Sequence, residues 1–204
     1  MARVSADVRR RELVAAAIRV MARDGVAKTT TRAIVTEADM QLGFFHYCFR
    51  SKQELLLQVI DTINQRNVIA ATAVVGQGRG LKETLAASLR AYWQDVETNP
   101  GTHQVTYELT QYALRTPGLA DVARRQYEGY LAMATEFLET AADAARVEWT
   151  TPVPVLARYV HTMLDGVTLA WIVDRDGAQA MAVLTEFADH LAKSARRRRA
   201  ARAS

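Results

Sequence analysis

The chain is poor in the residues that cross-link a fold or interrupt its helices. Its 204 residues include one Cys, four Pro and ten Gly. A single cysteine excludes an intramolecular disulfide and is typical of a reducing compartment. The low Pro and Gly content excludes collagen-like and linker-rich architectures and favours helices.

Long hydrophobic runs are also missing. No stretch reaches the ~18 consecutive apolar residues that indicate a membrane-spanning helix, and the first residues, MARVSADVRRREL, lack the apolar core of a signal peptide. We therefore expect a cytoplasmic protein without a membrane partner. With 50% apolar and 24% charged residues, the composition is that of a globular protein with a sizeable core.

The net charge of +4 is unevenly distributed along the chain. Residues 1–52 hold ten Lys and Arg against five Asp and Glu, and residues 193–204 hold six basic residues and no acidic one. The segment between them carries a net charge of −7. Basic ends of this kind indicate contact with a polyanion such as nucleic acid. A solvated basic surface is the alternative that charge alone leaves open.

The N-terminal quarter has helical periodicity. Apolar residues recur at three- and four-residue steps between Leu13 and Met21, and the pattern ends at Gly25. Ser51 followed by Glu54 makes a capping-box pattern, which predicts the start of a later helix. No segment of the chain alternates with period two for long enough to predict a strand.

Residues 28–52 predict a helix-turn-helix between these two helices. Threonines at 29–31 can cap a short helix, a second short helix fits 42–48, and residues 39–41 form the turn. The second helix of such a motif is narrow enough to enter the DNA major groove. An ordinary helical hairpin with its aromatic side chains packed inside is the alternative on spacing alone.

The second short helix has two different faces. Phe45 and Phe49 are four residues apart and are expected to anchor it to the core. The opposite face presents Gly43, which permits close approach to the sugar-phosphate backbone, and Tyr47, which can donate to a phosphate. Further candidate contacts to phosphates or base edges are Arg32, Phe44, His46 and Lys52.

Residues 155–173 predict a helix that is apolar on most sides. Its Arg158, His161 and Asp165 fall within about 60° of one another at the helical angle of 100° per residue. A helix of this kind needs two neighbours, its own core and, most simply, a second copy of the chain. An amphipathic helix over 178–191 can join the same interface. We therefore predict a homodimer through the last two helices.

The stretch from Arg11 to Leu56 resembles the DNA-binding region of TetR/AcrR-type transcriptional regulators. The family pattern is an Ala-rich first helix ending in Gly, paired threonines before the helix-turn, a recognition helix ending in aromatic-x-x-Phe, and a fourth helix that opens with Ser-Lys. These features appear here as AAAIRVMARDG, TTTRAIVTEAD, GFFHYCF and SKQELL.

This resemblance implies an all-α fold of about nine helices. An N-terminal three-helix helix-turn-helix domain at 1–52 would bind double-stranded operator DNA. A C-terminal helical domain at 53–195 would bind a small-molecule effector and dimerise. From composition, the arginine-rich residues 196–204 are expected to form a basic, disordered tail. By position, the family's DNA contacts fall on Thr31, Arg32, Gln41, Leu42, Gly43, Phe44, His46, Tyr47 and Lys52.

The sequence departs from the family pattern in three features. Asp39 stands where the turn usually has Gly, and Asp tolerates a left-handed backbone less well than Gly. Gln41 stands where Ser or Thr caps the recognition helix, and glutamine is a weaker cap. The usual Leu-Tyr pair is Phe45-His46, so a histidine replaces one phosphate-binding tyrosine.

The resemblance also implies a ligand cavity beyond residue 53 and a ligand-responsive repressor that a small molecule releases from its operator. Aromatic and soft side chains that commonly line small-molecule pockets occur in the relevant helices. Each of these side chains could instead be packed in the core. Glu108 and His103 could orient a polar group of the ligand, or they could lie exposed on the surface. The candidate ligand contacts are Trp93, Tyr107, Glu108, Tyr112, Tyr127, Tyr130, Met133, Phe137, Met163 and Trp171.

Other function classes find little support in the sequence. The segment GQGRG at 76–80 is not preceded by a strand pattern and completes no phosphate-binding motif. The histidines at 46, 103, 161 and 190 lack metal-ligand spacing, so neither an enzyme nor a cofactor is expected. Cys48 is a redox sensor or, more simply, a packed small residue. A helical interaction protein that has lost DNA binding is the remaining alternative, motivated by Asp39 and Gln41.

Overall fold

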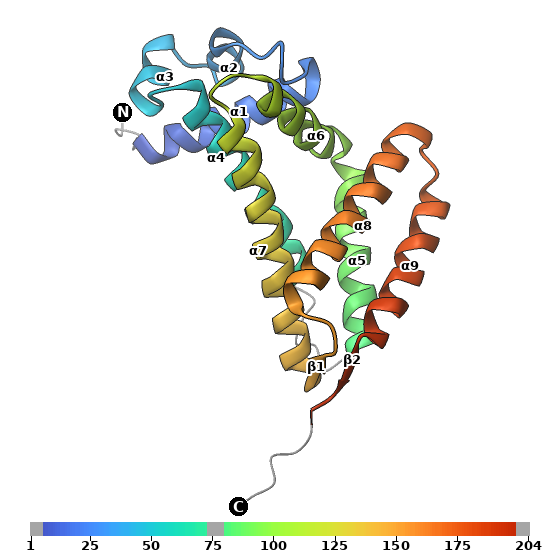
Figure 1. Cartoon of the computed structure of the whole chain (residues 1–204). Helices are drawn as coiled ribbons and strands as arrows, with labels where there is room; N and C mark the ends of the chain where they lie inside the picture. Colours follow the sequence, from blue (N-terminus) through green and yellow to red (C-terminus); the bar gives the residue numbers. More distant parts are fainter. Residues whose placement is uncertain (1–5, 73–79, 199–204) are drawn as a thin grey trace, which may run out of the picture. The chain divides into compact units, whose positions relative to one another are not determined.

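The computed structural model describes the chain over residues 6–72 and 80–198. Within these ranges it forms nine α-helices and two three-residue strands (Figure 1). The all-α fold expected from the sequence is confirmed, and no described helix combines the length and apolar character needed to cross a membrane. Apart from Gly80, the segment GQGRG at 76–80 lies outside the described residues.

The chain folds into two compact units, and neither is continuous in sequence. The first unit combines the residues up to Gln65 with Asn99–Gly129, and the second combines Arg66–Thr98 with the residues from Tyr130 onward. The helices are α1 (Ala6–Asp24), α2 (Thr31–Glu37), α3 (Leu42–Cys48), α4 (Lys52–Thr72), α5 (Leu81–Thr98), α6 (Pro100–Arg115), α7 (Ala120–Ala145), α8 (Val153–Asp174) and α9 (Gly177–Lys193).

The first unit builds one apolar core from α1–α4, α6 and the start of α7. Helix α6 turns Val105, Leu109 and Ala113, which repeat at four-residue steps, into the same core as the N-terminal helices. Its position is therefore set by burial of this stripe against α1–α4. Other members of the core are Leu13, Ile34, Phe45, Phe49, Leu56 and Val122.

The second unit has a separate core formed by α5, the later part of α7, α8 and α9. Helices α5 and α9 pack along each other, and an ion pair between Lys82 and Asp189 (2.9 Å) joins their surfaces. The core includes Leu85, Trp93, Leu138, Leu156, Leu184 and Leu191.

Strands β1 (Val147–Trp149) and β2 (Ala195–Arg197) pair antiparallel in the second unit. For Arg196–Arg198 they correct the expectation of a disordered tail: Arg196 pairs with Glu148 (2.7 Å), and Arg198 donates to the carboxylate of Asp143. A three-residue strand is too short to show period-two alternation, so the sequence pattern could not reveal it. Residues 199–204 lie outside the described part.

Candidate functional site

The helix-turn-helix predicted at 28–52 forms from local capping and turn chemistry. The Thr30 hydroxyl accepts the backbone N–H of Ala33 (3.1 Å) and caps α2. The turn that follows carries Asp39 with φ 52°, in the left-handed region where the family has Gly. Helix α3 then has the bounds expected from the sequence, Leu42–Cys48, and Gln41 at its N-cap makes no side-chain capping bond.

The two faces of α3 separate as predicted. Phe45 and Phe49 are 4% and 1% exposed, and their ring centroids lie 5.5 Å apart. On the other side, Tyr47 is 74% exposed, and a Cβ added to Gly43 would meet no atom within 4 Å. No packing contact in the described structure therefore requires glycine at position 43.

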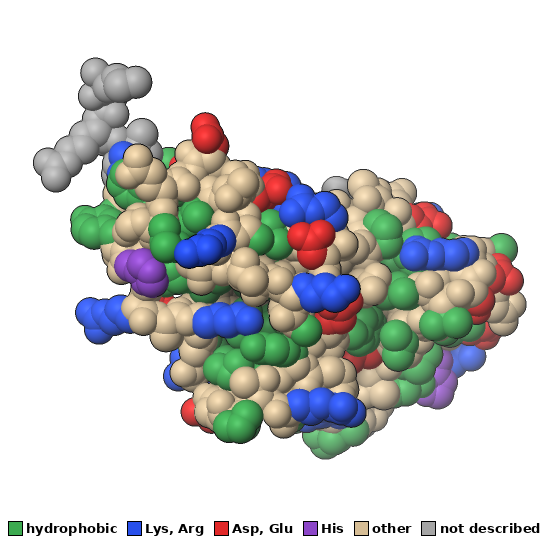
Figure 2. Space-filling view, turned by 90° about the horizontal axis from the view of Figure 1, so that it is seen from above, with side chains coloured by type: hydrophobic (Ala, Val, Ile, Leu, Met, Phe, Trp, Pro, Cys, Tyr) green, Lys and Arg blue, Asp and Glu red, His purple; other side chains and the backbone are tan. Residues whose placement is uncertain are grey.

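Most of the predicted DNA contacts lie on the surface. Phe44 is half-buried, because the Arg9 guanidinium lies 4.1 Å from its ring centroid, and Thr31 is half-buried at the start of α2. The exposed members are Arg32, Gln41, Leu42, Gly43, His46, Tyr47 and Lys52. Figure 2 looks onto this end of the chain, where Lys and Arg side chains stand among apolar ones.

Arg10 joins α1 to both sides of the α3–α4 turn. Its guanidinium donates to the backbone oxygen of Cys48 (2.6 Å) and to the carboxylate of Glu54 (2.7 Å). Glu54 also accepts the backbone N–H of Arg50 (2.8 Å), and this bond, followed by that from Arg10, lowers its pKa. The capping box at Ser51 therefore forms, since the Ser51 hydroxyl accepts the Glu54 N–H (3.1 Å), but its return bond goes to Arg50.

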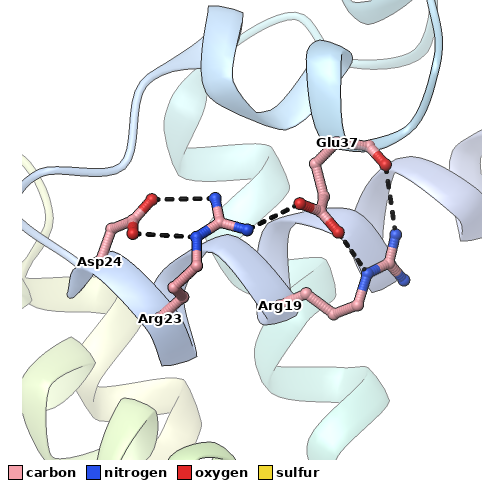
Figure 3. Close-up of polar contacts among 4 residues, drawn as sticks. All are labelled: Arg19, Arg23, Asp24 and Glu37. Atoms are coloured by element: carbon pink, nitrogen blue, oxygen red, sulfur yellow. Dashed lines mark hydrogen bonds and ion pairs between the residues drawn. The ribbon is translucent and has the colours of Figure 1, made fainter.

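A second charged network fixes α2 against α1 (Figure 3). The Glu37 carboxylate, at the end of α2, accepts from Arg19 (2.7 Å) and from Arg23 (2.8 Å), and Arg23 also pairs with Asp24 (3.0 Å). The bond from Arg19, and then that from Arg23, lowers the pKa of Glu37. These two arginines hold the orientation of α2 with charges that the acidic partners largely balance.

Helix α6 contacts the N-terminal helices of the first unit at two polar points. The Glu108 carboxylate accepts the backbone N–H of Val26 (2.9 Å), just after Gly25 ends α1 with φ 87°. A Cβ added to Gly25 would lie 3.2 Å from this carboxylate. About one turn further along α6, Lys52 donates to the Tyr112 hydroxyl (3.1 Å), which lowers the pKa of Tyr112.

Two family models match this chain, one in its N-terminal part and one in its C-terminal part. A family model described as "Bacterial regulatory proteins, tetR family" matches residues 13–59. A second, described as "BetI-type transcriptional repressor, C-terminal", matches residues 81–193. The chain belongs to the TetR family. As a member of it, the protein is a ligand-responsive DNA-binding repressor, and operator DNA and small-molecule effectors are the partners of this family.

Individual relatives agree with this assignment. The nicotine-responsive transcriptional repressor HdnoR of Paenarthrobacter nicotinovorans is 28% identical over 84% of this chain and 88% of its own length. Among solved structures, a TetR-family regulator of Rhodococcus sp. aligns with a TM-score of 0.78 at 18% identity, covering 91% of this chain and 98% of that one. The multidrug-binding protein EbrR, solved with imidazole, aligns at 0.60 and 28% identity over 87% of this chain and 93% of its own.

The candidate ligand residues of this TetR-family regulator fall in both units. Tyr107, Glu108, Tyr112 and Tyr127 belong to the first unit, where Glu108 and Tyr112 already bind Val26 and Lys52. His103, which the sequence left as a candidate surface residue, is buried, with 5% of its surface exposed. The members in the second unit are Trp93, Tyr130, Met133, Phe137, Met163 and Trp171.

The second unit brings some of these residues together. The rings of Trp93 and Trp171 meet edge to face with centroids 5.4 Å apart, and the ring of Tyr130 lies 4.8 Å from that of His161. Trp171 and Met163 also line a groove of about 240 Å³ between α8 and α9. His161 was missing from the candidate list, although its place in the short polar stripe of α8 was visible in the sequence.

Cys48 packs at the end of α3. It is 8% exposed, and burial raises the pKa of its thiol. Because the thiolate is the reactive form, this environment favours the packed small residue over the redox sensor.

Proposed function

We propose that the exposed face of α3 reads operator DNA in the major groove. The observation that carries this is the pairing of an exposed Tyr47 with a Gly43 that has open space where a side chain would stand. The buried rings of Phe45 and Phe49 hold the helix from behind, so this face is presented rigidly. The basic residues at the start of α2 and α4, Arg32 and Lys52, supply sequence-independent attraction to phosphates.

The remaining contacts divide by chemistry. Thr31, Gln41, His46 and Tyr47 have hydrogen-bonding side chains for phosphates and base edges. Leu42 and Phe44 offer apolar surface to a thymine methyl, and the Arg9 guanidinium over Phe44 adds a positive charge beside it.

We further propose that the protein acts as a homodimer through α8 and α9, within a ligand-binding and dimerisation domain at 53–195 that follows the DNA-binding domain at 1–52. Apolar side chains stand exposed along one stripe of α8: Val155 is 57%, Leu169 48% and Val173 80% exposed. At 100° per residue these three lie within about 40° of one another, on one side of the helix. A second copy is the simplest cover for such a stripe.

The double substitution of Leu169 and Val173 by Glu tests the dimer. We expect the wild type to run as a dimer and the double variant as a monomer in light scattering at micromolar concentration. Leu114→Glu is the matched control, because Leu114 is 61% exposed in the first unit, outside the stripe. A wild-type monomer, or an equal effect of the control, contradicts the interface.

The effector of this repressor is proposed to be a small molecule that binds the C-terminal domain and releases the operator. The relatives support this, because one is named nicotine-responsive and another multidrug-binding. Release follows if the ligand favours a conformation in which the two recognition helices leave the ~34 Å spacing of successive major grooves. The site of action is the bacterial cytoplasm, on the nucleoid when DNA is bound.

Fluorescence anisotropy with DNA from around the protein's own gene tests DNA reading. We expect affinity to fall steeply with salt, and Tyr47→Ala and Lys52→Ala to weaken it. Arg90→Ala is the matched control, because Arg90 is an exposed cation on α5 of the second unit. Binding that is absent, or that does not respond to salt, would favour the interaction protein instead.

A further inference from the structure

One of the proposed phosphate contacts is held in place by another helix. Lys52, the first residue of α4, donates from its ammonium to the hydroxyl of Tyr112 on α6 (3.1 Å). The same ammonium lies 4.7 Å from the centroid of the Tyr112 ring. A hydrogen bond and a cation–π contact therefore act on one charge, although the lysine side chain is exposed to solvent.

The tyrosine of this pair is itself anchored. Its ring packs, half-buried, against the apolar core of the first unit. At the C-cap of α6, the Thr116 hydroxyl donates to the Tyr112 backbone oxygen (2.7 Å). One turn earlier on the same face of α6, the Glu108 carboxylate accepts the backbone N–H of Val26 (2.9 Å). The position of the Tyr112 hydroxyl is therefore set by core packing and by α6.

Arg32, the other basic side chain among the proposed DNA contacts, lacks such support. It is exposed at the start of α2, and no described residue forms an ion pair, a hydrogen bond or a ring contact with its side chain. A long basic side chain that samples many rotamers loses conformational entropy when a phosphate fixes it. Lys52 is already held, so it has less entropy to lose.

The contact with Tyr112 leaves Lys52 able to bind an anion. An ammonium carries three N–H donors, and the tyrosine takes one of them. A protonated hydroxyl does not cancel the positive charge, in contrast to the carboxylates that pair with Arg10, Arg19 and Arg23. The two groups also interact electrostatically, because the hydrogen bond from Lys52 is the main cause that lowers the pKa of Tyr112.

We propose that Tyr112 is a positioning residue for operator binding: its hydroxyl and ring hold the Lys52 ammonium at the start of α4 for a backbone phosphate. The tyrosine acts through the lysine, by reducing the entropy that the lysine loses when it meets the phosphate. This role differs from the ligand contact that the sequence predicts for Tyr112. The inference rests on the proposed function, because it assumes that Lys52 contacts a phosphate.

A double-mutant cycle tests the coupling, with fluorescence anisotropy on DNA from around the protein's own gene. The four full-length proteins are the wild type, Tyr112→Leu, Lys52→Met and the double variant. Tyr112→Leu is expected to weaken binding about fivefold when Lys52 is present, and by less than about twofold in the Lys52→Met background. An equal loss in both backgrounds overturns the proposal, because the tyrosine would then act through packing alone.

Two further variants separate the contact with the ammonium from core packing. Tyr112→Phe keeps the ring and loses the hydroxyl, so it is expected to weaken binding about twofold, less than Tyr112→Leu. Leu57→Ala is the matched packing control, because Leu57 is also half-buried against the core of the first unit. Any loss of affinity in this control should be the same with Lys52 and with Lys52→Met. A dependence on Lys52 as large as that of Tyr112→Leu contradicts a specific role for the tyrosine.

The contact can also be measured without DNA. Carbon NMR on protein with labelled tyrosine rings follows the titration of Tyr112, whose signal is assigned by its loss in Tyr112→Phe. Lys52→Met is expected to raise the pKa of Tyr112, because it removes the hydrogen bond and the charge that lower it. Arg115→Met is the matched control, because Arg115 is an exposed cation in the last turn of α6. An equal pKa of Tyr112 in the wild type and in Lys52→Met contradicts the contact.

Operator binding by the single variants separates this inference from the proposed function. If Lys52→Met binds as tightly as the wild type while Tyr47→Ala binds more weakly, reading by α3 stands and the positioning role is refuted. If Lys52→Met weakens binding but the loss in Tyr112→Leu does not depend on Lys52, the phosphate contact stands and only the positioning role is refuted. A wild type that binds no DNA refutes the proposed function, and the positioning role with it.

Discussion

The two compact units fix their helices in different ways. In the first, charged and polar side chains link helices at defined atoms: Arg10 to Glu54, Arg19 and Arg23 to Glu37, and Glu108 to a backbone amide. In the second, the helices are held mainly by apolar packing, beside the Lys82–Asp189 ion pair and the Tyr92–Thr168 hydrogen bond. The first pattern sets the orientation of the helices around α3 at defined atoms, whereas the second relies mainly on apolar contacts.

The largest expected effect comes from removing a buried ring. Phe49→Ala is expected to destabilise the first unit by about 3–5 kcal/mol. All three tryptophans, Trp93, Trp149 and Trp171, lie in the second unit, so tryptophan emission reports that unit alone. In urea, we expect the circular dichroism of Phe49→Ala to fall before the emission changes.

Phe187→Ala is the counterpart in the second unit, where Phe187 is 3% exposed. It should shift the emission transition to lower urea. If the circular dichroism and emission transitions coincide in both variants, the two units unfold together as one cooperative unit.

Next in size is the loss of the polar link from α6. Glu108→Ala leaves the Val26 N–H without its carboxylate acceptor, and we expect a loss of about 1–3 kcal/mol in the free energy of unfolding. Glu108→Gln keeps an acceptor oxygen and should lose less. Chemical denaturation measures the free energy of unfolding of both variants. Glu136→Ala is the control, because Glu136 is an exposed residue of α7 in the second unit. Equal losses in the Ala and Gln variants would contradict a hydrogen-bonding role.

A smaller effect should separate stability from DNA binding. Gly43→Ala places a methyl group in open space on α3, and its higher helix propensity should stabilise the protein by up to about 1 kcal/mol. The same methyl group should weaken operator binding, because it holds the helix away from the sugar-phosphate backbone. Thermal unfolding and anisotropy on one preparation measure both effects. A variant that is more stable and binds as well would refute the close-approach argument.

The smallest expected effect concerns the pH dependence of stability, which should differ between the two units. Burial lowers the pKa of His161 below its ordinary 6.5, so the unfolded chain binds the proton more readily. The contribution of His161 to stability is therefore fully present above pH 6.5 and is lost as the pH falls. Glu37 and Glu54, whose pKa values lie below their ordinary 4.5, lose theirs only at lower pH.

Urea denaturation at pH 7.5 and 5.5 measures this difference. For the wild type, the tryptophan emission transition should move to lower urea concentration at pH 5.5 than at pH 7.5. His161→Gln should remove most of that shift. An unchanged pH response in the variant would assign the effect to another group.

The helix-turn-helix could be predicted because its signals are local in the sequence. Thr30, Gly25 and the Phe45/Phe49 spacing act through neighbours a few residues away, so α2, α3 and the buried face of α3 follow from the sequence. The partner of Glu108 could not be predicted, because Val26 is 82 positions away and nothing around an amphipathic helix specifies its distant contact. For the same reason the hydrogen bond between Lys52 and Tyr112 could not be predicted.

Long-range packing also limits what could be said of the second unit. The apolar stripe of α8 was readable, since periodicity shows which residues share a face. Periodicity does not show which helix covers that face, so the contacts of His161 with Tyr130 and of Thr168 with Tyr92 needed the structure. The assignment of individual rings to a ligand stays a prediction.

The pairing of β1 with β2 matters for anyone who shortens or tags this chain. A chain ending at Ser194 loses the strand partner of Val147–Trp149 and leaves the carboxylates of Glu148 and Asp143 without their arginines. A cleavable affinity tag joined after Arg198 keeps these contacts intact. A trimmed chain that keeps these contacts therefore has to extend at least to Arg198.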